Sequence, residues 1–315
     1  MKLKTRNPAC LVLEGGGVKC SYQYGALRTL VKIYGSIQDA VEEITGGDFM
    51  GIAGSSYGAV NSALILQGGM EGLEGFWDDL SAAKIFKEPR LQRIMEKIYR
   101  REKVFDAETA LFALSSGLDP LAKQREISKL YFDHIINSID EEAVRSCGLE
   151  LGLTAVELAN FEVDEEKVPK LPFDFNAQDL ALFPNYMKFV EKKLVYLTLE
   201  DIPEGELPYY VAASAAFPAF RPMKIRDRFF TDGGVLDNIP VRLMALRGYT
   251  KALVIRTGTG IPERKWEGVD VKFISPSREL GAAAVFSVEN IHETIALGEY
   301  DAEEAVKAFD VGGKK

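Results

Sequence analysis

A run of three glycines, a serine between glycines and an aspartate before two glycines are the features of this sequence that could carry chemistry. The glycines are Gly15–Gly17, the serine is Ser56 and the aspartate is Asp232. N–H groups in a glycine turn bind anions, a serine hydroxyl becomes a nucleophile once a base accepts its proton, and a carboxylate can be that base. The three features predict a nucleophilic serine beside an oxyanion site.

The glycine turn follows a short apolar run, Cys10 to Leu13, which is typical of a buried parallel strand. Apolar residues then recur at helical spacing from Leu27 to Tyr34. A strand that turns through glycines into a helix presents N–H groups beside the positive end of the helix dipole, where they stabilise a phosphate, a carboxylate or an oxyanion. No Gly-Lys-Ser/Thr follows the glycines, which excludes a P-loop. Cys20 stands where a dinucleotide-binding fingerprint needs its third glycine, so that motif is not matched either. The alternative to an anion site is that the glycines form only a tight connection between the strand and the helix.

Ser56 lies in a Gly-x-Ser-x-Gly pattern between an apolar strand, residues 49–53, and an apolar helix, residues 59–66. Such a nucleophile elbow holds its serine on a sharp turn, and the residues two before and two after it must be small. Gly54 and Gly58 meet that requirement. The helix N-terminus beside the hydroxyl would help to stabilise negative charge. We therefore expect Ser56 to be the nucleophile.

The base that activates the serine has two candidates. Only two histidines occur, and one of them, His292, completes the order Ser56, Asp232, His292 that α/β-hydrolases use. Its neighbours, however, follow a helical pattern and not a late loop, and His134 also lies in a helical segment. Asp232 alone is a poor base at its ordinary pKa of about 3.9, so burial would have to raise that pKa. Both arrangements remain open at this point.

Composition limits the class of protein. The chain has 315 residues with 47% apolar content, enough for one sizeable core. A net charge of −9 argues against general affinity for nucleic acid. Three widely spaced cysteines favour neither a disulfide framework nor a zinc site. Because the sequence shows neither a signal peptide nor an apolar stretch long enough for a membrane span, we expect a cytoplasmic protein, with export that uses no signal peptide as the alternative.

Strands and helices alternate along the chain, which predicts one α/β domain with a mainly parallel sheet. We expect strands near residues 10–13, 49–53, 148–158, 194–199, 252–256 and 271–275. We expect helices near residues 36–45, 59–66, 71–105, 107–114, 124–139 and 279–309, and a compact small-residue segment at 208–216. Residues 91–101 are typical of a basic amphipathic helix, whose charged face would be exposed either to solvent or to an anionic membrane surface. Aromatic residues within 170–190 suggest a loop packed on the core, or a lid.

Four motifs occur in the order seen in patatin-like phospholipases, and the sequence resembles that family from about residue 9 to 300. The motifs are Glu14-Gly-Gly-Gly-Val-Lys19, Gly54-Ser-Ser-Tyr-Gly58, Ala212-Ala-Ser-Ala-Ala-Phe-Pro218 and Asp232-Gly-Gly-Val-Leu-Asp-Asn-Ile-Pro240. The resemblance implies a three-layer α/β/α fold related to the catalytic domain of cytosolic phospholipase A2. It implies a single domain over 1–315, with insertions at about 85–147 and 165–192.

The same resemblance implies a lipid acyl hydrolase of the phospholipase A, lysophospholipase or carboxylesterase type, acting through an acyl-enzyme. It implies a Ser–Asp dyad without histidine, and neither metal nor cofactor. By position, Ser56 would be the nucleophile, Asp232 the base, and Gly15, Gly16, Gly17 and Val18 the oxyanion hole. The supporting residues would be Lys19, Gly54, Gly58, Gly233 and Gly234.

The first motif departs from the family pattern, Asp-Gly-Gly-Gly-x-Arg/Lys-Gly. Glu14 replaces the aspartate and Cys20 the last glycine, while Lys19 keeps the cation without the bidentate fork of arginine. We expect these changes to affect rate or substrate range. The expected partner is a phospholipid or another acyl-ester lipid, with transient contact at a membrane surface and no nucleic acid; the sequence predicts no oligomeric state. The alternative to an enzyme is a catalytically idle module that binds lipid or a protein.

Overall fold

The computed structural model describes residues 7–82, 120–159, 190–218, 220–260, 262, 264–281, 283 and 288–312. Within these ranges one sheet contains the strands β1 (Pro8–Leu13), β2 (Asp48–Ser55), β3 (Glu150–Ala159), β4 (Glu191–Thr198), β5 (Met223–Ile225), β6 (Arg228–Asp232), β7 (Lys251–Ile255) and β8 (Asp270–Ile274). The α-helices are α1 (Ser21–Tyr34), α2 (Ile37–Thr45), α3 (Tyr57–Ala82), α6 (Pro120–Ser138), α7 (Glu141–Ser146), α8 (Leu207–Ser214), α9 (Val241–Leu246) and α10 (Val288–Gly312). Two short 3₁₀ turns, η1 (Gly17–Cys20) and η5 (Gly233–Val235), lie at the ends of strands.

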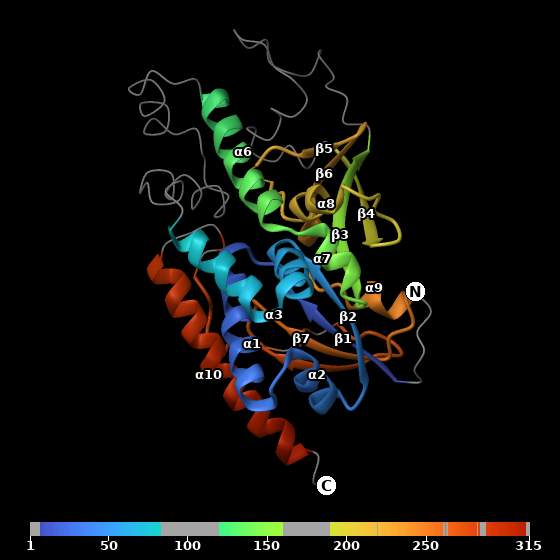
Figure 1. Ribbon diagram of the computed structural model, residues 1–315, viewed down its shortest axis with the longest axis vertical. Coiled ribbons are helices and arrows are strands. Elements are labelled where there is room, and N and C mark those ends of the chain that lie inside the picture. Colours follow the sequence, from blue (N-terminus) through green and yellow to red (C-terminus); the bar gives the residue numbers. More distant parts are fainter. Residues whose placement is uncertain are drawn as a thin grey trace.

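The strand order is β5-β6-β3-β2-β1-β7-β8, with β4 paired to β3 outside this path. The pairs β3–β2, β2–β1, β1–β7 and β7–β8 are parallel, whereas β4, β5 and β6 join by antiparallel pairs. The prediction of an α/β fold with a mainly parallel sheet is confirmed. In Figure 1, α1, α2, α3 and α10 surround the parallel strands, while α6, α8, β5 and β6 form the other end of the molecule.

The two faces of the sheet bury different amounts of apolar surface. Alternate residues of β1 point to opposite faces: Leu11 and Leu13 join the main core, while Cys10 and Val12 join a smaller one. The main core is covered by α1, α2, α3, α6, α8 and α10, and the smaller one by α9. Because both faces are covered, the central strands read as continuous apolar runs.

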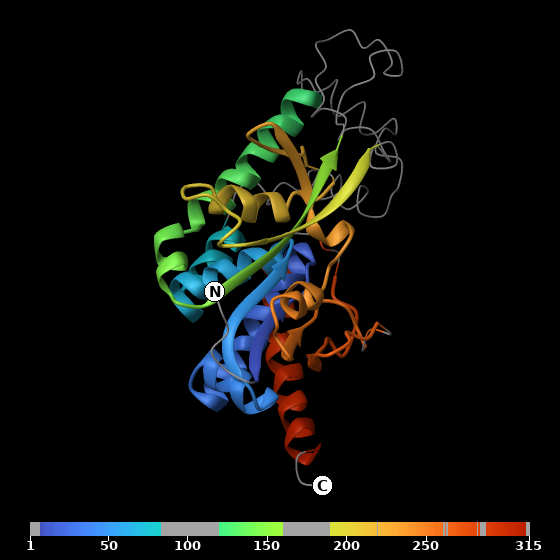
Figure 2. The same ribbon diagram turned by 90° about the vertical axis from the view of Figure 1, so that its right-hand side faces the viewer.

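Strand β3 positions the ends of two other strands. Its residue Thr154 pairs with Ser55 at the end of β2, and its residue Ala155 pairs with Asp232 at the end of β6. Since β4 occupies the other edge of β3 along this stretch, β2 and β6 share one edge and meet end to end. Figure 2 shows β3 running from the parallel half into the opposite end. The last residue of β6 and the residue after β2 are therefore neighbours.

The last helix begins later than the sequence pattern predicts. Residues 279–281 are not helical, and α10 starts at Val288, so the prediction of a helix from 279 is wrong at its start. The reason is that Ala283 accepts a hydrogen bond from the N–H of Val18 (2.9 Å), which requires this stretch to lie against the glycine loop. From Val288 onward the helix packs along α1 (Figure 1).

The predicted insertions are described only in part. Residues 83–119 and 160–189 lie outside the described ranges, so the basic amphipathic segment at 91–101, the predicted helix at 107–114 and the aromatic segment at 170–189 are not assessed. Within the first insertion, α6 and α7 pack on the main core through Tyr131, Ile135 and Val144. The segment expected to be compact at 208–216 is the helix α8. Among the described helices, none has the length and apolar content of a membrane span.

Candidate active site

Ser56 occupies a strained turn between β2 and α3. Its φ is +55°, in the left-handed region that a residue with a Cβ adopts at a cost of about 1–3 kcal/mol. A Cβ on Gly54 would lie 2.2 Å from the carbonyl oxygen of Gly58, and one on Gly58 would lie 2.2 Å from that of Leu13. Strand and helix thus approach each other through these two glycines, as an elbow requires. The first turn of α3 directs its dipole at the serine.

Asp232 lies directly opposite the serine. Its Oδ2 accepts a hydrogen bond from Ser56 Oγ (2.6 Å), and its Oδ1 accepts one from the N–H of Gly234 (2.7 Å). The carboxyl is 4% exposed, and burial raises its pKa to about 6, although both hydrogen bonds act in the opposite direction. Gly233 is needed here because a Cβ would lie 2.3 Å from the Thr154 carbonyl oxygen. The pair has the geometry of a nucleophile and its base.

The glycine loop lies against the nucleophile. A Cβ on Gly15 would come within 2.8 Å of the Ser56 Cβ, so only glycine lets the two segments approach this closely. Gly17 has a φ of +57°, and a Cβ there would meet the Ala283 carbonyl oxygen at 2.3 Å. The loop then enters η1 and α1, as the sequence predicts.

Two of the four predicted oxyanion donors are engaged elsewhere. The N–H of Gly15 donates to the carbonyl oxygen of Asn238 (3.2 Å), and that of Val18 donates to Ala283 (2.9 Å). The sequence prediction that Gly15 and Val18 are oxyanion donors is therefore corrected, because an N–H that is already bonded is not available to an oxyanion. Within the described residues, the N–H groups of Gly16–Gly17 have no hydrogen-bond partner, and both residues are partly exposed. These two amides are the available donors.

Glu14, which departs from the family pattern, is buried and well bonded. Its Oε2 accepts from the N–H of Thr257 (2.8 Å) and of Gly258 (3.2 Å). The same oxygen lies 3.2 Å from Arg256 Nε. Because this carboxylate joins the glycine loop to the loop after β7, the longer side chain has a structural function here.

Cys20 and Lys19 occupy η1. The Cys20 thiol is buried and donates to the Glu14 carbonyl oxygen (3.4 Å). Burial, and then the nearby Glu14 and Asp232 carboxyls, raise the pKa of this thiol well above its usual range. It is therefore unsuited to be a second nucleophile. Lys19 is partly exposed at the end of the glycine loop.

Neither histidine joins the site. His292 is exposed on α10, and the ring of His134 on α6 packs at a tilt of 38° against that of Phe76 (ring centroids 4.8 Å apart). The direct bond between Ser56 and Asp232 leaves no place for an imidazole between them. The arrangement that uses His292 is therefore not the one in this structure.

Three polar residues that sequence reasoning did not assign also contact the site. Ser214 Oγ accepts from the N–H of Ser56 (3.0 Å). Asn238 Nδ2 and Thr257 Oγ1 both donate to the Gly15 carbonyl oxygen, at 3.0 and 2.7 Å. Ser214 and Asn238 stand inside motifs recognised in the sequence, which was a usable signal, whereas nothing near Thr257 marked it.

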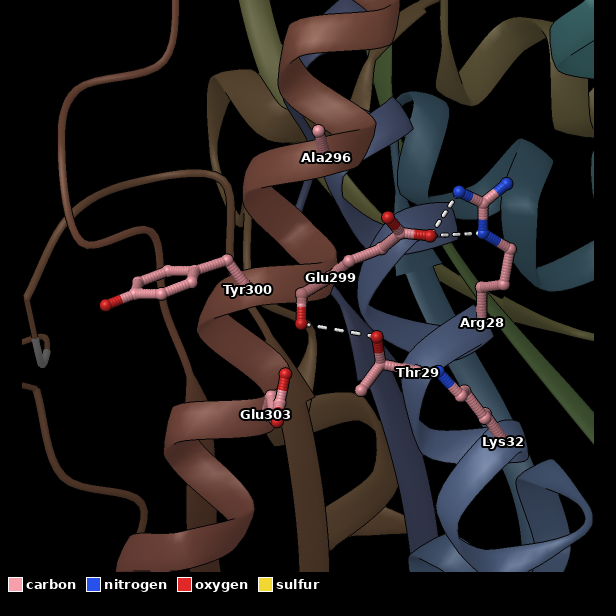
Figure 3. A pocket seen from close by; sticks show the side chains of 7 residues that line it. All are labelled: Arg28, Thr29, Lys32, Ala296, Glu299, Tyr300 and Glu303. Carbon is pink, nitrogen blue, oxygen red and sulfur yellow. Dashed lines mark hydrogen bonds and ion pairs between the residues drawn. The ribbon is translucent and has the colours of Figure 1, made fainter.

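A separate hollow lies between α1 and α10 (Figure 3). Its lining residues are mostly charged or polar: Arg28, Thr29, Lys32, Ala296, Glu299, Tyr300 and Glu303. Arg28 is paired with Glu299, and Thr29 Oγ1 donates to the Glu299 carbonyl oxygen (3.2 Å), as Figure 3 shows. The hollow contains neither member of the Ser56–Asp232 pair. In the part of the chain that the structure describes, no group of three or more His, Cys, Asp or Glu side chains is placed to hold a metal ion.

Comparison with known proteins identifies the family of this chain. The chain is similar in structure to VipD from Legionella pneumophila (TM-score 0.45, 12% identity), covering 96% of this chain and 67% of VipD. It is also similar to ExoU of Pseudomonas aeruginosa, solved in complex with SpcU (TM-score 0.36, 14% identity), covering 96% of this chain and 52% of ExoU. The chain thus spans about half the length of ExoU. No curated protein matches it in sequence. The sequence model of the patatin-like phospholipases matches residues 11–245, and the chain therefore belongs to the patatin-like phospholipase family.

Proposed function

We propose that this chain hydrolyses carboxylic esters of lipids with Ser56 as nucleophile and Asp232 as general base. Family membership supports lipid acyl hydrolase activity in general. The observation that carries the assignment of residues is the 2.6 Å hydrogen bond from Ser56 Oγ to a buried carboxylate whose pKa is raised to about 6. A base with this pKa is mostly ionised at neutral pH and is a better proton acceptor than an ordinary aspartate.

The reaction proceeds in two steps. Asp232 accepts the proton as Ser56 Oγ attacks the ester carbonyl carbon, and the carbonyl oxygen becomes an oxyanion. The N–H groups of Gly16 and Gly17, with the N-terminus of α3, stabilise this charge. Collapse of the intermediate expels the alcohol, which takes the proton from Asp232, and leaves an acyl-serine. Asp232 then takes a proton from a water molecule as that water attacks the acyl-serine, and gives the proton to Ser56 Oγ as the acyl–oxygen bond breaks and the fatty acid leaves.

The test is hydrolysis of p-nitrophenyl esters of increasing chain length by the wild type and by two variants, Ser56→Ala and Asp232→Asn. We expect both variants to lose at least about 1,000-fold in kcat, because each removes a group on which the proton transfer depends. His292→Ala is the matched control and should keep full activity. An active Asp232→Asn would disprove the dyad.

An idle binding module is the competing function for this fold. A fluorophosphonate probe separates the two, because it labels a serine only where a base and an oxyanion site activate it. We expect stoichiometric labelling of the wild type, and none of Ser56→Ala. A wild type that is unlabelled and inert on every ester would favour the binding module.

A further inference from the structure

One buried segment contacts both members of the dyad. At the end of α8, Ser214 Oγ accepts a hydrogen bond from the N–H of Ser56 (3.0 Å). Two residues later, the Ala216 carbonyl oxygen accepts from the N–H of Asp232 (3.0 Å) and from Thr231 Oγ1 (2.8 Å). Ser214 and Ala216 have no exposed surface. The distance between nucleophile and base therefore depends on a single turn of chain.

The bond from Ser214 supports a backbone that would otherwise be unfavourable. Ser56 has a positive φ, and its N–H precedes the first turn of α3, where a helix provides no acceptor. Because Ser56 is only 7% exposed, water is a poor substitute partner. An unmatched buried N–H is unfavourable and would add to the strain of the turn itself. Loss of this bond would let the turn relax and move the Ser56 hydroxyl.

Tyr131 connects the same segment to the helix α6. Its hydroxyl donates to the Ala215 carbonyl oxygen (2.8 Å), and its ring stacks on Phe220 (centroids 4.0 Å apart, planes 14° apart). The ring also contacts that of Tyr57, which directly follows the nucleophile, at a centroid distance of 5.9 Å. Tyr131 is 2% exposed. It therefore touches both the segment that holds the dyad and the residue next to the nucleophile.

We propose that Ser214 and Tyr131 are positioning residues of the dyad: Ser214 fixes the backbone of the nucleophile, and Tyr131 binds α6 to the segment that holds nucleophile and base together. The inference rests on the proposed function, since it concerns the alignment of the same two groups. It also gives α6, which lies in a predicted insertion, an indirect part in catalysis, through the alignment of the dyad. Rearrangement of α6 would change the alignment of Ser56 with Asp232.

The pH profile of kcat/KM distinguishes positioning from general stability. The hydroxyl of Ser56 holds the pKa of Asp232 down, so a misplaced hydroxyl lets that pKa rise. Two other titratable groups face Asp232, Cys20 from η1 and Tyr131 from α6. Burial raises the pKa of both well above their usual ranges, so they stay neutral from pH 5 to 8. The acid limb of the profile therefore reports Asp232.

The experiment measures kcat and KM for p-nitrophenyl butyrate between pH 4.5 and 8 in Ser214→Ala, Ser214→Thr and Tyr131→Phe. We expect Ser214→Ala to lower kcat by about 10- to 100-fold with KM nearly unchanged, the effect of losing one buried hydrogen bond at the nucleophile. Its acid limb should move above pH 6, and Ser214→Thr, which keeps the hydroxyl, should restore most of the activity. Tyr131→Phe, which keeps the ring, should move the limb in the same direction by less.

Ser128→Ala is the matched control, because this buried serine of α6 also accepts a backbone N–H, from Arg221 (3.3 Å), without contacting the dyad. It should leave the acid limb in place even if it lowers the melting temperature. The proposal is overturned if Ser214→Ala and Tyr131→Phe melt at lower temperature but keep wild-type kcat and acid limb. An active Ser56→Ala, measured alongside, would instead overturn the dyad itself.

Discussion

The turn that carries Ser56 and the loop that carries Asp232 meet at 2.6 Å, yet different forces hold them. Around Ser56 the constraint is steric: backbone atoms of Gly58 and Leu13 occupy the places where side chains of Gly54 and Gly58 would be. Around Asp232, Gly233 is packed just as closely against the Thr154 carbonyl oxygen. The aspartate itself is held by hydrogen bonds, from its N–H to Ala216 and from the N–H of Gly234 to its Oδ1, and a Cβ on Gly234 would first meet a side-chain atom. Substitution of Gly58 should therefore break the first region, whereas substitution of Gly234 should tune the second.

The largest expected effect is on the serine side. Gly58→Ala places a methyl group 2.2 Å from a backbone oxygen of β1, which cannot move without opening the sheet. We expect a loss of more than about 4 kcal/mol in the free energy of unfolding, at the extreme of single substitutions. Urea unfolding measures it. The control is Gly75→Ala in the same helix, where a Cβ meets nothing within 4 Å and should stabilise by about 0.5–1 kcal/mol.

On the aspartate side, Asp232→Asn should abolish activity and stabilise the fold. In the wild type the raised pKa means that the folded protein holds its proton up to about pH 6, whereas the unfolded chain releases it near 3.8. The contribution of Asp232 to stability is therefore fully present below pH 3.8, falls between pH 3.8 and 6, and is constant above. The loss amounts to about 3 kcal/mol at 1.36 kcal/mol per pKa unit.

Melting curves of wild type and Asp232→Asn at pH 4 and pH 7 test this. The variant should be the more stable at pH 7, and the difference should be much smaller near pH 4, where the folded state holds the proton and the unfolded state is only partly ionised. A variant that is less stable at both values would show that Asp232 contributes to the fold through its charge, contrary to our account.

The difference between the two regions also explains what the sequence could predict. The elbow could be predicted from the local sequence, because small residues on both sides of Ser56, between an apolar strand and an apolar helix, indicate a sharp strand-to-helix turn. They could not choose between Asp232 and His292 as the base without the family resemblance, because that choice depends on which strand ends meet. The register along β3, where Ser55 and Asp232 pair with the adjacent residues Thr154 and Ala155, brings Asp232 to the serine and supports the proposal that it is the base.

The oxyanion loop shows the same limit in finer detail. The three glycines predict a nest of N–H groups, but not which of them are already bonded. The N–H groups of Gly15 and Val18 donate to the carbonyl oxygens of Asn238 and Ala283, respectively, which are more than 200 residues away along the chain. Contacts between residues so far apart in the sequence leave no local sequence pattern. The contact of Thr257 with the Gly15 carbonyl oxygen could not be predicted for the same reason.

The next largest expected effect is the decrease of activity at acid pH. Since only ionised Asp232 accepts the serine proton, kcat/KM should fall about tenfold per pH unit below pH 6 and stay constant above it. An aspartate at its ordinary pKa of about 3.9 would place the limb two units lower. The profile of His292→Ala should coincide with that of the wild type. A limb that disappears in His292→Ala would assign the base to histidine.

The smallest effect should come from a glycine on the aspartate side. In Gly234→Ala the methyl group would meet Asn238 Oδ1 at 2.4 Å, a side-chain atom that can rotate away, unlike the backbone oxygen at Gly58. Rotation would break the bond from Asn238 Nδ2 to the Gly15 carbonyl oxygen, so we expect a loss of about 1 kcal/mol in stability. We expect kcat to fall by less than about tenfold, because one hydrogen bond to the loop carrying the oxyanion donors is affected.

A double-mutant cycle with Asn238→Ala isolates this contact. Asn238→Ala removes both the obstacle and the hydrogen bond, so adding Gly234→Ala to it should cost almost nothing further. Additive losses in the two variants would mean that Gly234 is required for its backbone conformation and not for the room it leaves. In that case Gly234 would be as indispensable to the Asp232 loop as Gly58 is to the Ser56 turn, and the proposed contrast between these two glycines would fail.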